Sequence, residues 1–277
     1  MAELRDSNEL SFSEVEEIVF LLKNVSDFDL SGYTRSSLKR RIQRIMNLED
    51  MDMVDLKNAL VNVEGFQQYF IQEVTVNVTE MFRDPGFFNK LNKDIIPYLQ
   101  TFPRIKIWSA GCSTGEEVYS LAILLKENNL SDRAFIYGTD INSKVLEVAK
   151  KGIYPINKFK EYSDNFNAYN STESLSNYYT ARYDAAIINH DLRQNILFST
   201  HNLATDQVFN EFQLITCRNV LIYFDLKLQE HVINLFYQSL ALFGFLCLGT
   251  KETLMRHEIM DNFKVIDKEY NIYQKIK

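Results

Sequence analysis

The chain has 277 residues, of which 46% are hydrophobic and 13% aromatic, enough apolar material to bury an ordinary core and to exclude an intrinsically disordered protein. Only 9 Gly and 4 Pro exclude collagen-like and low-complexity classes. The formal net charge of -7 disfavours a protein whose whole surface follows a nucleic-acid backbone, but it is compatible with a local basic patch.

Cysteine usage and the apolar runs indicate a cytoplasmic protein. Cys112, Cys217 and Cys247 lie far apart and form no C-x-x-C pair, so we expect neither a disulfide framework nor a zinc site. The four histidines show no metal-ligand spacing, and we expect no metal. The first residues are charged where a secretory signal needs an apolar core, and residues 232–248 are too polar for membrane insertion.

Residues 1–75 carry apolar positions at helical spacing and almost no glycine, which predicts a small all-helical domain. Helices are expected at residues 13–24, 34–46, 53–62 and 64–73. The second of these holds five bases and no acid within ten positions: Arg35, Lys39, Arg40, Arg41 and Arg44. At 100° per residue most of them lie off the apolar face, so one side packs and the other is cationic. A solvated helix face and a functional basic patch both fit this pattern.

From about residue 100, short β-branched and aromatic runs alternate with amphipathic helices, which is the α/β signature. Gly244 is expected to stop a long helix before a buried strand, and the chain ends in a predicted hairpin. The expected order is strand 105–108, helix 116–125, strand 135–140, helix 143–151, strand 212–217, helix 226–242, strand 245–248 and hairpin strands 264–266 and 271–274.

An inserted element is expected near residues 175–198. Residues 165–177 are rich in Asn and Ser, which predicts a loop. Residues 178–183 and 185–189 flank Asp184 like two short strands joined by a tight turn, and residues 195–198 are a candidate third strand.

The turn after the first expected strand points to a cofactor. Gly111 and Gly115 allow a ligand to approach the backbone, and Gly111 is a candidate cofactor-binding residue. Glu116 and Glu117 open the following helix, where a pyrophosphate would meet two carboxylates. S-adenosylmethionine (SAM) has no phosphate and carries a sulfonium and an ammonium, so the acidic turn favours it. Asp140 ends the second strand, where an acid meets ribose hydroxyls in such folds, although a strand-end Asp can also be a helix cap.

Five sequence blocks in order resemble the CheR family, the chemotaxis receptor methyltransferases. The resemblance covers nearly the whole chain, but the N-terminal domain matches in pattern more than in letters. The blocks are VNVTEMFRD at 76–84, WSAGCSTGEE at 108–117, GTDI at 138–141, HNL at 201–203 and CRNVLIYFD at 217–225.

The resemblance implies a Rossmann-like, seven-stranded SAM-dependent methyltransferase sheet with an N-terminal helical domain. The implied boundaries are a helical receptor-recognition domain at 1–75, a linker contributing cofactor residues at 76–99, and a methyltransferase domain at 100–277 with a small inserted antiparallel β-subdomain. The implied cofactor is SAM, which leaves as S-adenosylhomocysteine (SAH). The implied product is a methyl ester on glutamates in the cytoplasmic domain of chemoreceptors.

The resemblance also implies site residues. Arg83 and Tyr223 look like the pair beside the transferring methyl group. The implied cofactor-binding residues are Asn77, Thr79, Arg83, Glu117, Asp140, Asn202, Leu203, Arg218 and Asn219. Because a glutamate carboxylate is ionised at neutral pH, its attack on the sulfonium methyl needs no general base. Arg83 could hold that carboxylate, the cofactor carboxylate or both, and Tyr223 could donate one hydrogen bond or simply pack as an aromatic.

The basic helix gains a role from the resemblance, which implies that its five bases bind the acidic methylation region of the receptor. Nucleic acid is a disfavoured partner because the domain and the chain are both acidic. Some family members grip a C-terminal receptor peptide through a glycine-rich loop, but residues 182–185 are short and lack glycine, so weak or no tethering is expected. The alternatives are a SAM-binding regulatory module, or a methyltransferase that acts on another protein, a small-molecule acid or nucleic acid.

Overall fold

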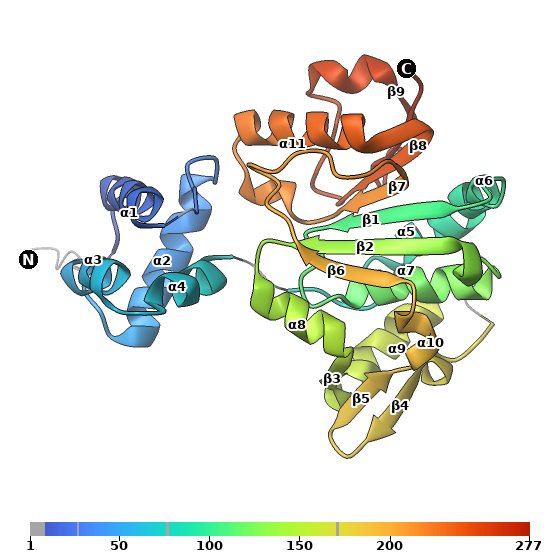
Figure 1. Cartoon of the computed structure of the whole chain (residues 1–277), viewed down its shortest axis with the longest axis horizontal. Coiled ribbons are helices and arrows are strands. Elements are labelled where there is room, and N and C mark those ends of the chain that lie inside the picture. The colour runs from blue at the N-terminus through green and yellow to red at the C-terminus, as the bar shows by residue number, and fades with distance from the viewer. Residues whose placement is uncertain (1–8, 27, 76–77, 170–171) are drawn as a thin grey trace, which may run out of the picture. The chain divides into compact units, whose positions relative to one another are not determined.

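The structure is a computed structural model that describes residues 9–26, 28–75, 78–169 and 172–277. It divides into two compact units, and the division does not follow chain order. One unit contains Met1–Val76 and Tyr223–Gln229, and the other contains Asn77–Ile222 and Glu230–Lys277. Figure 1 draws the helices and strands of both units. Within the described ranges, no helix combines the length and the apolar character needed to cross a bilayer.

The first unit is helical, as the spacing of its apolar residues predicts. Ser11 and Asp52 begin two helices through capping boxes, in which each side chain accepts the N3 backbone amide. Ile18, Leu38 and Phe70 are buried among the helices. The helices are α1 (Phe12–Val25), α2 (Arg35–Glu49), α3 (Met53–Asn62) and α4 (Phe66–Val74). All four predicted helices are confirmed, with ends that shift by less than a turn.

A segment from late in the chain, Tyr223–Gln229, packs with this helical unit. The Thr34 amide donates to the Tyr223 carbonyl over 2.9 Å. The rings of Tyr33 and Phe224 meet edge to face, with centroids 5.1 Å apart. These contacts join residues almost two hundred positions apart, so no local sequence pattern predicts them.

The second unit is built around a mixed seven-stranded sheet in the order β6-β2-β1-β7-β8-β10-β9. Parallel partners β2 and β7 flank β1, so the strand order reverses there. Ligands of such sheets bind beyond the carboxyl ends of the strands at this reversal. The strands are β1 (Ile105–Ala110), β2 (Ala134–Asp140), β6 (Ile196–Thr200), β7 (Phe212–Cys217), β8 (Leu240–Leu248), β9 (Phe263–Asp267) and β10 (Ile272–Lys275). The predicted α/β class and closing hairpin are confirmed.

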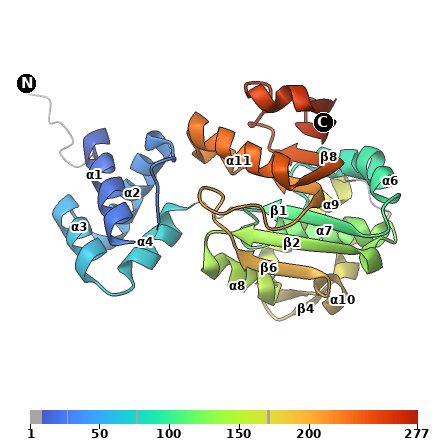
Figure 2. The same ribbon diagram turned by 45° about the horizontal axis from the view of Figure 1, so that its top comes forward.

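Helices cover both faces of this sheet (Figures 1 and 2). Trp108 of β1 packs on Phe236 of α11, with ring centroids 5.2 Å apart. Its neighbour Ile107 joins the apolar cluster that contains Val118 of α7. Because successive strand residues point to opposite faces, α11 and α7 lie on opposite sides of the sheet. The helices around the large sheet are α5 (Pro85–Lys90), the π-helical turn Leu91–Ile95, α6 (Ile96–Leu99), α7 (Glu116–Glu127), α8 (Ser143–Lys151) and α11 (Leu226–Ser239).

A smaller antiparallel sheet has the order β3 (Ile153–Pro155), β5 (Ala185–Ile188), β4 (Tyr179–Arg182). The hairpin around Asp184 is therefore confirmed. The prediction that residues 195–198 add its third strand is wrong, because β6 pairs in parallel with β2 at the edge of the large sheet and β3 takes that place. Phe198 fixes this arrangement by packing closely over Gly138 of β2.

The loop predicted at residues 165–177 is partly wrong, because α9 (Phe159–Ala168) extends into it. Phe159, Tyr162 and Phe166 recur at helical spacing and are all buried. Burial of this apolar face outweighs the Asn and Ser residues, which disfavour a helix only weakly. A 3₁₀ turn, Leu175–Tyr178, and the short helix α10 (His190–Arg193) complete this region.

The prediction that a helix continues to residue 242 and stops at Gly244 is also wrong. α11 ends at Ser239, and Gly244 lies inside β8. The pairing of β8 with β7 shifts register between Phe212 and Leu214, which marks a bulge. A Cβ on Gly244 would lie 3.1 Å from the Phe212 carbonyl oxygen, so glycine is needed for the close approach of the two strands.

Candidate functional site

The turn after β1 is fastened to the end of β2. The amides of Gly111 and Cys112 both donate to the Thr139 carbonyl, over 2.8 and 2.9 Å. The next residue, Ser113, has a φ of 51° and donates its amide to Asp140 over 2.8 Å. This sequence of bonds fixes the turn at the point where the strand order reverses.

The two glycines of this turn allow close approach of other parts of the chain. A Cβ on Gly111 would lie 2.4 Å from Val220 Cγ2, and one on Gly115 would lie 2.8 Å from Ala149 Cβ. Both have positive φ, 72° and 90°, which favours glycine. Gly111 thus has a structural reason to be glycine, and its contact with a cofactor stays a prediction.

Asp140 lies at the end of β2, where the sequence predicts it, and its side chain is buried. One carboxylate oxygen accepts from Ser113 and the other accepts the Asn142 amide over 2.9 Å. Burial raises the pKa of this carboxyl above its ordinary value, although the backbone amides oppose the shift. Each oxygen keeps a lone pair, so the group can still accept from two adjacent hydroxyls of a ribose.

Glu117 lies in the first turn of α7, and its carboxylate reaches the ends of β1 and β7. It accepts from Thr216 Oγ1 over 2.7 Å, from Arg218 Nη1 over 3.0 Å and, at 3.4 Å, from Ser109 Oγ. The helix dipole and the guanidinium both stabilise the negative charge. A fixed carboxylate at this edge suits a cationic ligand.

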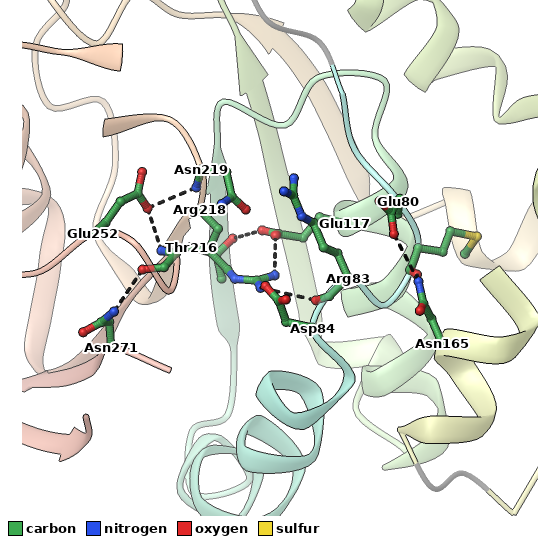
Figure 3. A network of polar contacts seen from close by, with 12 residues as sticks. Glu80, Arg83, Asp84, Glu117, Asn165, Thr216, Arg218, Asn219, Glu252 and Asn271 are labelled. Carbon is green, nitrogen blue, oxygen red and sulfur yellow. Dashed lines mark hydrogen bonds and ion pairs between the residues drawn. The ribbon is translucent and has the colours of Figure 1, made fainter. Parts of the chain in front are cut away.

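Arg218 connects Glu117 to the segment before the first strand (Figure 3). Its Nη2 donates to Asp84 over 2.6 Å and to the Arg83 carbonyl over 3.2 Å. Its guanidinium lies 4.0 Å from the centre of the Phe87 ring, and only 2% of the side chain is exposed. Arg218 therefore directs its Nη donors at protein groups, which suits a residue that positions the site.

The segment Glu80–Asp84, within the predicted linker, carries Arg83 into this network. Arg83 is half-buried, and in the part of the chain that the structure describes its guanidinium makes no hydrogen bond or ion pair. In Figure 3 no dashed line reaches that guanidinium; the bond drawn at Arg83 ends on its carbonyl. Thr79 is also half-buried, whereas Asn77 lies outside the described residues.

Glu252 is a residue of the site that sequence reasoning missed. Its buried carboxylate accepts the amides of Asn219, Ile222 and Gly249 over 3.0, 3.2 and 2.6 Å. Burial raises the pKa of Glu252 against the effect of these amides. The bonds hold the turn after β7, including Asn219 at a φ of 62°. A carboxylate soon after the end of β8 was the available signal, and Figure 3 shows it beside Asn219, joined to it by a dashed line.

Asn202 and Leu203 follow β6. The backbone amide of Asn202 donates to the Asp206 carboxylate over 2.9 Å, and its side-chain oxygen accepts from the Ala204 amide over 2.9 Å. Leu203 is buried. The pair thus forms a local turn that follows the strand next to Asp140, and its contact with a cofactor stays a prediction.

The remaining predicted residues lie in the helical unit. Tyr223, predicted to act with Arg83, packs there with the Arg41 guanidinium 4.5 Å from its ring centre. Arg41 is only 7% exposed and donates to the Val74 carbonyl over 2.6 Å. The expectation that Arg41 belongs to a solvent-facing cationic surface is therefore wrong, because burial against Tyr223 and the end of α4 takes it inside.

Three of the other predicted bases are paired with acids of the same unit. Arg35 bonds Glu16 over 2.5 Å, and Lys39 bonds Glu9 over 2.8 Å. Arg44 bonds Glu73 over 3.1 Å. Arg40 is exposed and, among the described residues, makes no ion pair. It is the best candidate on α2 for binding an acidic partner.

The residues present fit SAM. Two fixed carboxylates, Asp140 and Glu117, stand at the carboxyl ends of adjacent strands, and no lysine or arginine free to bind a pyrophosphate opens α7. This donor set suits ribose hydroxyls and a cationic ammonium or sulfonium. Within the described ranges no cluster of three or more His, Cys, Asp or Glu could hold a metal.

Comparisons with known proteins agree with this geometry. The family model described as CheR methyltransferase, SAM binding domain, matches residues 77–272. The chain is 43% identical over 249 residues to Cher3 of Pseudomonas putida, covering 90% of this chain and 91% of that one. It is 30% identical over 256 residues to the chemotaxis protein methyltransferase of Salmonella typhimurium, covering 88% and 84%. Among solved structures it is similar to the N-methyltransferase NodS of Bradyrhizobium japonicum, with 14% identity, a TM-score of 0.35 and coverage of 61% and 62%.

Proposed function

The chain belongs to the CheR methyltransferase family and is a SAM-dependent methyltransferase, and from this premise we propose that it methylates glutamate side chains of chemoreceptors. The chemotaxis methyltransferases among its relatives support a receptor substrate. The single observation that supports a glutamate acceptor is Arg83. Among the described residues its guanidinium has no acidic partner, and Arg218 connects its segment to Glu117.

The proposed reaction is a direct transfer to an oxygen. Bound SAM supplies a methyl group on a positively charged sulfur. Arg83 holds the acceptor carboxylate, the SAM carboxylate or both, and so orients the two reacting groups. The acceptor needs no general base because it is already ionised, and opposite charges disappear along the path, so a dry and rigid site speeds the step.

In the proposed cofactor site, Asp140 accepts from the ribose hydroxyls and Glu117 faces the ammonium. Asn77, Thr79, Gly111, Asn202, Leu203 and Asn219 line the remaining surface. Arg218 acts through Glu117 and Asp84, because its own side chain is almost fully covered. Tyr223 donates one hydrogen bond beside the methyl group, as the resemblance implies.

We propose that the helical unit recognises the acidic methylation region of the receptor, and that Arg40, which is exposed and makes no ion pair among the described residues, contributes to this binding. Tethering to a receptor peptide is proposed to be weak or absent. The β4–β5 turn has only two residues between its strands, Tyr183 and Asp184, and Tyr183 is fully exposed with a φ of 54°.

The test uses tritiated SAM and receptor-bearing membranes, with alkali-released methanol as the readout for methyl esters. The wild-type protein should produce base-labile counts, and Arg83→Ala should reduce them at least about 100-fold without unfolding. Arg256→Ala, at an exposed arginine away from this segment, is the control and should match the wild type.

Two results would contradict the proposal. SAM binding without any base-labile product would identify a regulatory module. Counts that do not depend on receptor, but appear with a small-molecule acid or nucleic acid, would identify a methyltransferase of different substrate class.

A further inference from the structure

The peptide that carries Arg83 has an unfavourable backbone conformation. Phe82 has a φ of 52° and Asp84 a φ of 58°, so the residues on both sides of Arg83 are left-handed. A bulky residue such as Phe rarely adopts this region, and it does so only where surrounding contacts enforce it. The direction of Arg83 therefore depends on whatever holds Phe82.

Ser120 of α7 holds Phe82 from one side. Its Oγ accepts the Phe82 amide over 2.8 Å and donates to the Glu116 carbonyl over 2.8 Å. Ser120 is completely buried in an otherwise apolar stretch of α7, where a hydroxyl without partners would be costly. The hydrogen bond to the Phe82 amide of the linker explains why a serine occupies this buried position.

The helix α9 holds the same peptide from the other side. Asn165 Nδ2 donates to the Met81 carbonyl over 3.1 Å and to Glu80 over 3.3 Å, and Figure 3 shows it facing this segment. The ring of the next residue, Phe166, meets the Phe82 ring edge to face, with centroids 4.9 Å apart. Amide and ring together restrain the backbone on either side of the left-handed residue.

We propose that Ser120 and Asn165 are positioning residues for methyl transfer, which hold the peptide between Met81 and Phe82 and thereby the left-handed conformation of Phe82 that directs Arg83. The inference rests on the proposed role of Arg83 toward the acceptor carboxylate. Neither side chain bonds Asp140 or Glu117 in the described part of the chain, so their loss should affect the transfer step more than cofactor binding.

The experiment measures kcat for methyl transfer and the dissociation constant for SAH in four variants. Ser120→Ala should lower kcat at least about tenfold and change SAH affinity less than about threefold. Ser239→Ala is the matched control, because Ser239 is equally buried but its hydroxyl has no hydrogen-bond partner among the described residues. It should leave both values within about twofold of the wild type.

Asn165→Ala provides a second variant that keeps the idea testable if Ser120→Ala unfolds, since Asn165 is only half-buried. It should lower kcat less than Ser120→Ala does. The double variant should be no worse than the poorer single one, because both act through one peptide. Additive losses, or a full kcat in Ser120→Ala, would overturn the proposal.

A second measurement needs no methyl acceptor and separates this inference from the proposed function. Phenylglyoxal labelling of Arg83, mapped by mass spectrometry, should differ at least about threefold in rate between Ser120→Ala and wild type, while Ser239→Ala matches wild type. Equal rates would overturn positioning. By contrast, full activity of Arg83→Ala would reject the proposed role of Arg83 and leave any change in labelling standing.

Discussion

Asp140 is fixed by two backbone amides independently of any ligand, so its carboxylate can meet ribose hydroxyls without reorganisation. We expect Asp140→Ala to weaken SAH binding about 10- to 100-fold, the loss of one or two hydrogen bonds to a charged acceptor. Calorimetry measures the affinity. Asp132→Ala, at an exposed aspartate, is the control, and an unchanged affinity in Asp140→Ala would remove Asp140 from the ribose site.

The same residue predicts a pH dependence. Because burial raises the pKa of Asp140, the folded state binds its proton at a higher pH than the unfolded state does. Its contribution to stability is therefore full below the unfolded pKa and is lost as pH rises through the folded pKa. SAH affinity should follow the opposite direction and fall as pH is lowered through the raised pKa. Asp140→Asn should show a flatter dependence of SAH affinity on pH across that transition.

The two acids that we propose to meet the cofactor could be singled out from the sequence, whereas residues that hold the backbone could not. Asp140 and Glu117 follow from strand ends and from the acidic turn. The side chains of Ser120 and Glu252 bond backbone groups, and their partners on other elements are set only when distant strands and helices are brought together. Sequence shows a serine in an apolar helix but not which amide it satisfies.

At the scale of elements, the spacing of apolar residues predicted those helices and strands whose formation depends on burying one local apolar face. The four helices of the first unit and the β1-α7-β2 order follow from apolar spacing. α9 was missed because composition was weighed above spacing, and β6 was misplaced because strand partners depend on the whole sheet. Both errors lie where tertiary packing overrides a short-range signal.

α2 also shows the limit of local pattern. A helical wheel does not show that, of its five bases, one is buried, three are paired with acids and one, Arg40, is exposed without an ion pair among the described residues. Arg40→Glu should raise the apparent KM for receptor about fivefold and flatten its salt dependence, since an exposed unpaired charge acts mainly on association. Lys160→Glu makes the same charge change at an exposed residue of α9 and should leave the KM for receptor unchanged. If both variants have the KM of the wild type, the exposed side of α2 is only a solvated surface and does not bind receptor.

At the scale of the whole molecule, the two units do not correspond to two stretches of sequence. The segment Tyr223–Gln229 lies in the second half of the chain but contributes buried Phe224 and Leu228 to the helical unit. Deleting residues 1–75 would expose these side chains as well as remove the proposed receptor-binding surface. Loss of activity after such a deletion therefore could not be assigned to substrate recognition, and point substitutions are the cleaner test.

Phe224 allows the late segment to be tested directly. Phe224→Ala should destabilise the helical unit by about 3 kcal/mol, the cost of removing a buried phenyl ring, and so speed hydrogen exchange of the α2 amides about 100-fold. Leu226→Ala is the control, because Leu226 lies in the same segment but is 64% exposed. SAH affinity should stay within about twofold of the wild type in both variants, since Glu252 holds the cofactor-side turn independently. Equal α2 exchange in Phe224→Ala and Leu226→Ala would mean that the helical unit is stable without this segment.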